Sequence, residues 1–390
     1  MNVWKSHLLV AIVTMIFVNA MVVPFVWAEE PRKPWTTSRI HGAPHPPAPY
    51  KIVSAFPKIR FDKPSCIEEI PGANRLLVTE IGGKVFSFPK RADMKQADLA
   101  IDLAVVTGGR VSLFDADFHP KFVENRQVFL CYVHPGNGGH TRVSCFTMTD
   151  TSRPTIEADS EQVIITWPNG GHNGGCLEFA KDGTLYISTG DGSGPNPPDG
   201  RTTGQDLSDL LGAVLRIDVD RSEGDRAYGV PKDNPFVDTD GARPEIWAYG
   251  LRNPWKFGVD SVSGNVFVAD NGWETWEMVH QIVRGGNCGW PVMEARAMLR
   301  SEVEVGPTPI IPPITAVGMV SARRRCLSQG PAHCKTWLVP GLAPGLSTGL
   351  LTGGGWPLYG GTPGHPAPHS PRAAPPPALP RAARPRARPP

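Results

Sequence analysis

Residues 170–192 read GGHNGGCLEFAKDGTLYISTGDG, and this stretch contains the pattern that decides the fold. An apolar run over 176–180 is followed by a turn at Asp182 and Gly183 and then by a second apolar run over 185–188. Two short runs of strand-forming residues around a turn of this kind are typical of an antiparallel hairpin. The stretch therefore predicts two paired strands with glycine-rich loops at their ends.

The same hairpin unit recurs between residues 50 and 314. Four hairpins are expected, each with a first and a second strand. The four pairs of strands are 66–70 with 76–79, 113–118 with 128–132, 176–180 with 185–188, and 255–259 with 266–269. Repeated hairpins, in a chain with 42 Gly and 42 Pro, predict an all-β fold rather than a helical one. A β-propeller with about four blades is the favoured arrangement, and a sandwich of hairpins is the alternative.

Charge is distributed unevenly along the chain. Residues 315–390 contain nine Lys and Arg but no Asp or Glu, so residues 1–314 carry a net charge of −7 although the whole chain carries +2. An acidic body lacks the basic stripe of a nucleic-acid-binding protein. The segment 315–390 is rich in Pro, Arg, Ala and Gly and is expected to be disordered. Out-of-frame translation of a GC-rich gene is one origin for such a composition.

The N-terminus has the features of a secretory signal. A mostly apolar run extends over 8–27, after Lys5. Val26, Trp27 and Ala28 then stand directly before two glutamates. We interpret 1–28 as a signal peptide and 29–49 as a flexible lead-in, with an uncleaved membrane anchor as the alternative. The protein is therefore expected to be periplasmic or secreted, with no membrane contact beyond the signal segment.

The seven cysteines form no CxxC pair and so indicate neither a zinc site nor a c-type haem. Cys131 and Cys145 lie symmetrically about the turn 136–139. A cross-strand disulfide and a pair of buried free thiols are both compatible with that spacing.

Polar residues are concentrated at one end of the predicted hairpins. In an antiparallel hairpin, the residues before the first strand and after the second lie at the same edge. His172, Asp191, Arg252 and Asn253, together with residues 270–274, are therefore expected at one mouth of the propeller. A histidine that removes a proton, an arginine that stabilises a negative oxygen and carbonyl-rich loops that bind calcium suit the oxidation of a hydroxyl group.

Four long runs resemble the glucose/sorbosone dehydrogenase family. They are GGHNGGCLEFAKDGTLYISTGDG (170–192), GQDLSDLLGAVLRIDVD (204–220), RPEIWAYGLRNPWKFGVD (243–260) and GGNCGWPVMEAR (285–296). The resemblance covers about residues 50–313 and implies a six-bladed propeller of which this chain has about four blades. The family includes soluble glucose and aldose sugar dehydrogenases that use pyrroloquinoline quinone (PQQ), and also the hedgehog-interacting proteins.

The resemblance implies roles for five residues. His172 is similar to the base that takes the sugar hydroxyl proton while hydride passes to the quinone, and Arg252 to the residue that faces the quinone oxygen, with Asn253 beside it. Gly272 and Trp273 occupy the positions whose backbone carbonyls bind the calcium of the cofactor. A sugar substrate and an electron acceptor such as a cytochrome or a quinone would complete the reaction.

The chain also departs from the family pattern. Gly171 stands where quinone-using relatives have an Asp, Arg110 where Gln or Glu is common, and Cys288 where a Tyr is usual. The basic contacts to the quinone come from the last two blades in the family, and nothing after Ile314 matches them. The 390-residue chain is therefore expected to be inactive. A propeller that binds a carbohydrate or a protein without catalysis is the alternative function.

Overall fold

The computed structural model describes residues 53–136 and 139–318. The expected signal peptide, the lead-in and all but the first four residues of the expected tail lie outside these described residues. Within the described ranges, no helix combines the length and the apolar character needed to cross a bilayer.

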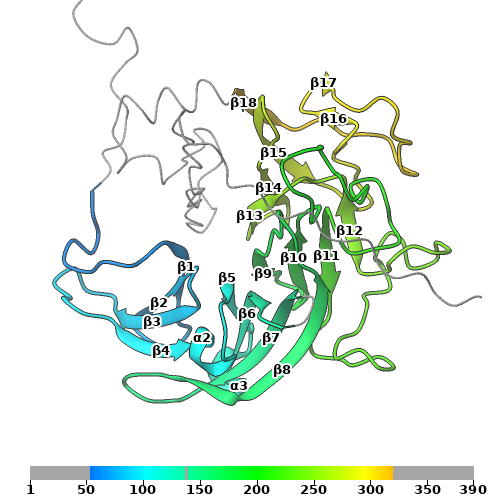
Figure 1. The fold of residues 1–390 in the computed structure, drawn as a ribbon. Helices are drawn as coiled ribbons and strands as arrows, with labels where there is room; N and C mark the ends of the chain where they lie inside the picture. The colour runs from blue at the N-terminus through cyan, green and yellow to red at the C-terminus, as the bar shows by residue number, and fades with distance from the viewer. Residues whose placement is uncertain (1–52, 137–138, 319–390) are drawn as a thin grey trace, which may run out of the picture. The chain divides into compact units, whose positions relative to one another are not determined.

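Four antiparallel sheets of four strands each make up most of the described chain (Figure 1). The first sheet contains β1 (Pro64–Glu69), β2 (Arg75–Glu80), β3 (Lys84–Pro89) and β4 (Asp98–Asp102); the second contains β5 (Ser112–Phe118), β6 (Gln127–His134), β7 (His140–Met148) and β8 (Ile156–Pro168). The third contains β9 (Leu177–Phe179), β10 (Leu185–Thr189), β11 (Ala213–Ile217) and β12 (Ile246–Tyr249); the fourth contains β13 (Pro254–Val259), β14 (Val266–Asp270), β15 (Trp276–Ile282) and β18 (Thr315–Gly318).

Three short elements lie between these strands. The one-turn helix α2 (Leu103–Val106) follows the first sheet, and α3 (Phe122–Asn125) lies between β5 and β6. A small hairpin of β16 (Met293–Glu294) and β17 (Ala297–Met298) is inserted between β15 and β18. This insertion explains why the fourth strand of the last sheet, β18, is reached only after residue 314.

The predicted all-β propeller is confirmed, with four blades among the described residues. Each of the four predicted hairpins is the first strand pair of one blade: β1 with β2, β5 with β6, β9 with β10, and β13 with β14. The first strands of consecutive blades contact one another, β1 with β5, β5 with β9 and β9 with β13, so they are the innermost strands (Figure 1).

Charged side chains join these innermost strands. Lys256 of β13 lies 2.7 Å from the Asp115 carboxylate of β5, and both side chains are nearly excluded from solvent, at 10% and 4% exposure. The other Asp115 oxygen accepts a hydrogen bond of 2.9 Å from the backbone amide of Leu177 in β9. One carboxylate therefore connects the second, third and fourth blades near the axis.

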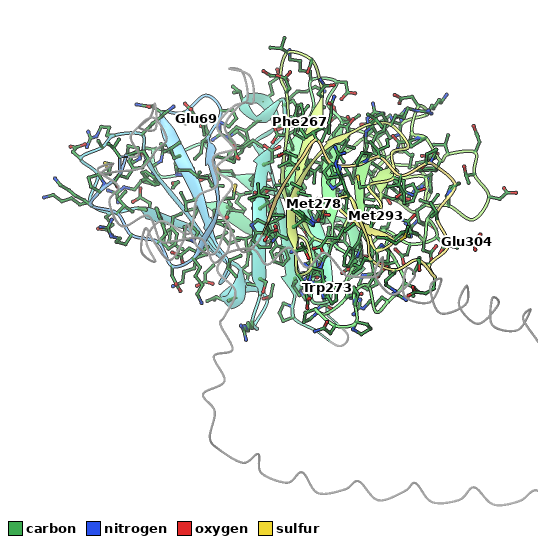
Figure 2. The ribbon with its side chains drawn as sticks, turned by 90° about the horizontal axis from the view of Figure 1, so that it is seen from above. Glu69, Phe267, Trp273, Met278, Met293 and Glu304 are labelled. Carbon is green, nitrogen blue, oxygen red and sulfur yellow. The ribbon has the colours of Figure 1, made fainter. Side chains whose placement is uncertain are left out.

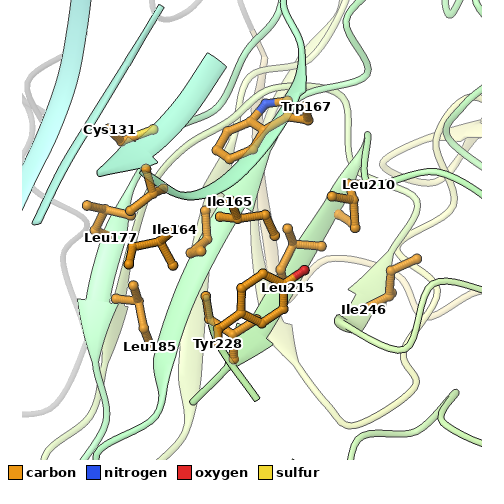
Figure 3. Close-up of a cluster of buried hydrophobic side chains, with 14 of the residues drawn as sticks. Cys131, Ile164, Ile165, Trp167, Leu177, Leu185, Leu210, Leu215, Tyr228 and Ile246 are labelled. Atoms are coloured by element: carbon orange, nitrogen blue, oxygen red, sulfur yellow. The ribbon is translucent and has the colours of Figure 1, made fainter. Parts of the chain in front are cut away.

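Apolar side chains fill the space between neighbouring sheets. The cluster between the second and third blades includes Trp167, Leu177 and Leu215 (Figure 3). Cys131 and Cys145 belong to the same cluster, but Cys131 pairs with Val143 across the strands and Cys145 pairs with Phe129. This diagonal placement is too wide for a disulfide, and both cysteines are free thiols.

Candidate functional site

The loops at one end of the third and fourth blades carry the candidate site. In the register of these sheets, Pro254 at the start of β13 pairs with Asp270 at the end of β14. Figure 2 shows Phe267, near the start of β14, and Trp273, just after its end, at opposite ends of the fourth blade. The residues that precede β9 and β13 therefore share an edge with those that follow β10 and β14, as the hairpin geometry predicts.

His172 and Asp191 form a buried pair at this edge. His172 Nδ1 lies 2.7 Å from Asp191 Oδ1, and the two side chains are 1% and 0% exposed. Asp191 Oδ1 also accepts from the Ser193 amide at 2.8 Å, and Oδ2 accepts from Trp290 Nε1 at 2.8 Å. Amide and indole N–H groups can only donate, so both Asp191 oxygens act as hydrogen-bond acceptors. We therefore assign the Nδ1 proton to His172, which makes Nε2 the basic nitrogen of the ring.

Arg252 lies beside this pair, on the loop that leads into β13. The Asp191 backbone amide donates to the Arg252 carbonyl at 2.9 Å, which joins the loops of the third and fourth blades. The Arg252 guanidinium lies 5.6 Å from the centre of the Trp290 ring and donates to the Asn271 carbonyl at 3.2 Å. His172 and Arg252, eighty residues apart, are thus brought together through Asp191 and Trp290.

Burial perturbs the charged groups around Arg252. Desolvation lowers the pKa of Arg252, while the nearby carboxylates of Asp191 and Asp270 act in the opposite direction. Burial also raises the pKa of Asp270 to about 7, although its oxygens accept hydrogen bonds from the backbone amides of Arg252 and Asn253. Arg252 Nε is buried and has no hydrogen-bond partner among the described residues. Such a buried donor suits an anionic or carbonyl oxygen of a ligand.

Asn253 and Gly190 fix the position of the His172 loop. The Asn253 side-chain oxygen accepts a hydrogen bond of 3.2 Å from the Gly174 amide. A Cβ at Gly190 would lie only 2.6 Å from the His172 carbonyl group, so the two loops approach too closely for a larger residue. The backbone around His172 is therefore determined by contacts with both neighbouring loops.

Two glutamate carboxylates accept hydrogen bonds from backbone amides of the loop after β14. Glu277 accepts the Gly272 amide at 3.2 Å, and Glu294 Oε1 accepts the Trp273 amide at 2.7 Å. A Cβ at Gly272 would lie 1.7 Å from the Trp276 carbonyl oxygen, so only glycine fits there. The Trp273 indole N–H donates to the Pro195 carbonyl at 2.6 Å and thereby joins this loop to the one after β10.

Comparison with known proteins gives the family. The family model described as "Glucose / Sorbosone dehydrogenase" matches residues 61–310. The chain belongs to the glucose/sorbosone dehydrogenase family.

This chain aligns with only part of the length of the following relatives. The HIPL1 protein of Arabidopsis thaliana is 32% identical over 237 residues, which cover 48% of this chain and 34% of HIPL1. The aldose sugar dehydrogenase YliI of Escherichia coli strain K12 is 30% identical over 238 residues, 60% of each chain. The PQQ-bound form of an aldose sugar dehydrogenase from Streptomyces coelicolor is 21% identical, with a TM-score of 0.52 over 66% of this chain and 69% of that structure. That likeness supports the propeller fold.

The residues of this glucose/sorbosone dehydrogenase homologue fit the polar part of a quinone site. Arg252 offers a desolvated donor, and the loop after β14 offers carbonyl oxygens on the side opposite to its amides. Among the described residues, no group of three His, Cys, Asp or Glu side chains is placed to hold a metal. The family resemblance implies the backbone carbonyls of Gly272 and Trp273 as ligands of a cation.

Three residues of the site were not assigned roles from the sequence. Trp290 is 1% exposed and bonds Asp191, Asp270 orients the Arg252 loop, and Glu294 holds the loop after β14. Trp290 and Glu294 both lie in the GGNCGWPVMEAR run, so the run itself was the available signal. Their partners are 99 and 21 residues away and are visible only in three dimensions.

Proposed function

We propose that this chain carries the site residues for the PQQ-dependent oxidation of an aldose or a related sugar alcohol group. The observation that supports the proposal most strongly is the 2.7 Å contact between His172 Nδ1 and Asp191, which lies beside the buried guanidinium of Arg252. When bound, PQQ would supply the acceptor for the two electrons and the hydrogen that leave the sugar carbon.

His172 would act as the general base. Its Nε2 would take the hydroxyl proton, and the ring would become an imidazolium whose Nδ1–H still donates to Asp191. The ionised Asp191 carboxylate would stabilise that positive charge and hold the ring in the required tautomer, in the way that a buried Asp supports a catalytic His in hydrolases. Ser193 and Trp290 would hold the Asp191 carboxylate in place.

Arg252 would stabilise negative charge on an oxygen of the cofactor. Its guanidinium is nearly excluded from water, where an electrostatic interaction is stronger than at the surface. Asn253 would support this arrangement from the neighbouring position by holding the Gly174 amide. The carbonyls of Gly272 and Trp273 would bind calcium, which would polarise the reacting carbonyl of the quinone. A periplasmic or secreted location and an electron acceptor such as a cytochrome or a quinone remain parts of the proposal.

A non-catalytic binding propeller is the second candidate, and Gly171 favours it. The resemblance places an Asp before the base in quinone-using relatives, but a Cβ at Gly171 would lie 2.3 Å from the Ser193 carbonyl oxygen. The present backbone therefore has no room for that Asp. Cys288 is a second departure, because a thiol is a shorter side chain and a weaker hydrogen-bond donor than the tyrosine hydroxyl usual at this position.

Dye reduction after reconstitution with PQQ and calcium tests the first candidate. We expect no turnover from the 390-residue chain, because the resemblance assigns the basic quinone contacts to blades beyond the family match, which ends at residue 310. A chimera in which the C-terminal segment of YliI replaces residues 314–390 should oxidise aldoses. In that chimera, His172→Ala should lower kcat by ~10²–10⁴-fold.

Two results would contradict the proposal. A folded chimera that binds PQQ but oxidises no sugar in a broad panel would favour the binding function. A chimera whose kcat is the same with His172→Ala would show that another group is the base.

A further inference from the structure

The loop that follows β14 is organised around one carboxylate oxygen. Glu294 Oε1 accepts hydrogen bonds from four consecutive backbone amides, those of Trp273, Glu274, Thr275 and Trp276, at 2.7, 3.1, 3.2 and 3.3 Å. Glu294 is 3% exposed and lies in β16 of the inserted hairpin. A segment of successive amides that converge on one anion is a backbone nest.

The nest fixes the direction of the carbonyl groups. In a planar trans peptide, the C=O of one residue points opposite to the N–H of the next. The amides of Trp273 and Glu274 point at Glu294, so the carbonyls of Gly272 and Trp273 point away from it. The preceding peptide follows the same rule, because the Gly272 amide faces Glu277 and the Asn271 carbonyl accepts from Arg252. The carbonyl of Asn271, which precedes those of Gly272 and Trp273, is thus on the Arg252 side of the loop.

We propose that Glu294 is a positioning residue for calcium binding: by holding the amides on one side of the loop, it turns the carbonyls of Gly272 and Trp273 toward the mouth. This inference rests on the proposed function, which assigns those two carbonyls to the cation. Glu294 itself does not touch the ion. Gly272 is required for the same arrangement, because a Cβ there would collide with the Trp276 carbonyl and would also lie 2.8 Å from Glu294 Oε1.

The inserted hairpin keeps Glu294 in place. Glu294 pairs with Ala297 across β16 and β17, and the next amide, that of Ala295, donates to the Met278 sulfur at 3.1 Å. Met278 belongs to β15 and is buried, so the carboxylate is anchored to the blade rather than to a mobile side chain. The insertion between β15 and β18 therefore acts as a support for the cation loop.

Calcium affinity of the full 390-residue protein tests this inference without any need for turnover. Affinity is measured by calorimetry and by calcium displacement of terbium, whose emission the neighbouring tryptophans sensitise. Glu294→Ala should weaken calcium binding at least ~10-fold, as is usual for the loss of an outer-shell partner of a metal site. Glu294→Gln keeps an oxygen acceptor of the same length and should stay within about 3-fold of the wild type.

Two further variants separate position from charge. Glu294→Asp keeps the charge but withdraws the oxygens by one methylene, so it should weaken binding although the net charge is unchanged. Glu274→Ala is the matched control, because it removes an exposed carboxylate from the same loop while its backbone amide remains in the nest. It should change affinity by less than about 3-fold, as expected for a solvent-screened charge. Circular dichroism shows whether each variant is folded, and Glu294→Asp carries the test if Glu294→Ala is not.

The outcomes distinguish this inference from the proposed function. Wild-type affinity in both Glu294→Ala and Glu294→Asp would overturn the role of Glu294 alone. Equal damage from Glu294→Gln and Glu294→Ala would show that charge, not hydrogen bonding, is what matters, and would also overturn it. Absence of calcium binding in the wild type would remove the cation from the proposed function, and this inference with it.

Discussion

Replacing Lys256 with methionine should destabilise the propeller more than any single surface change. Lys256 and Asp115 form a buried pair at 2.7 Å, and Lys256 also donates to the Phe114 carbonyl at 3.4 Å. Burial acts to lower the pKa of Lys256, but the Asp115 carboxylate, together with the thiols of Cys176 and Cys66, raises that pKa above its ordinary value. Lys256→Met keeps most of the side-chain volume and removes the charge.

The size of the effect follows from what is left behind. Asp115 would remain 3% exposed without its cation, and the raised pKa values of Glu68 and Asp117, caused first by burial and then by neighbouring carboxylates, show that negative charge is already unfavourable there. Breaking a buried ion pair by removing one partner costs about 3–5 kcal/mol. We expect a loss of about 4 kcal/mol in the free energy of unfolding, within the total stability of a typical domain.

Urea denaturation followed by tryptophan fluorescence at pH 7 measures this loss. The double variant Asp115→Asn/Lys256→Met removes both charges while the Asn oxygen can still accept the Leu177 amide. It should therefore be less destabilised than the sum of the two single variants, with a coupling of about 2 kcal/mol. The reasoning that this pair stabilises the contact between three blades would be refuted by either of two results. One is a loss of free energy of unfolding below about 1 kcal/mol for Lys256→Met. The other is strict additivity of the two single-variant effects in the double variant.

Two further predictions concern Glu178 and Trp290. Burial, followed by the carboxylates of Asp117 and Glu68, raises the pKa of Glu178 from 4.5 to about 9. Between these two pH values the folded state holds a proton that the unfolded state loses. The stability that Glu178 contributes therefore declines as the pH rises from about 5 toward 9. Glu178→Gln should therefore be stabilising by roughly 4–5 kcal/mol at pH 8–9 and nearly neutral at pH 4–5. An equal effect at all pH values in urea titrations would contradict the burial argument. Trp290→Phe deletes the indole donor to Asp191 but keeps an aromatic ring. Thermal or urea unfolding should show a loss of about 1–3 kcal/mol in the free energy of unfolding. An unchanged midpoint would mean that the buried carboxylate finds another donor.

The two inner strands of each blade could be predicted from the sequence because their residues are apolar in short runs bounded by turns. The expected runs 185–188 and 266–269 lie within β10 (Leu185–Thr189) and β14 (Val266–Asp270). The outer strands give weaker patterns: β8 (Ile156–Pro168) is largely exposed at the sheet edge, and β18 is separated from β15 by an inserted hairpin. A pattern based on burial does not detect strands that are held mainly by backbone hydrogen bonds.

Hairpin geometry predicts which residues of the site share an edge, but it does not predict their side-chain contacts. That geometry places His172, Asp191 and Arg252 at one edge, but it does not give the contact between His172 and Asp191, which depends on how the loops fold back. Trp290 is buried, and its indole N–H makes a specific bond to Asp191 that burial patterns do not reveal. The roles of His172, Arg252, Asn253, Gly272 and Trp273 stay predictions, since their positions alone do not establish chemistry.

The orientation of the peptides after β14 has a consequence for sequence variation. Because the loop presents acceptors toward the mouth through its main chain, the side chains of Glu274 and Thr275, which are exposed, contribute little to what binds there. Those two positions should tolerate many replacements without loss of ion preference, whereas Gly272 and Glu294, neither of which resembles a ligand in a side-chain motif, should tolerate almost none. Searches that score conserved carboxylates as ligands would overlook such a site and would misread its one buried glutamate as part of the coordination sphere.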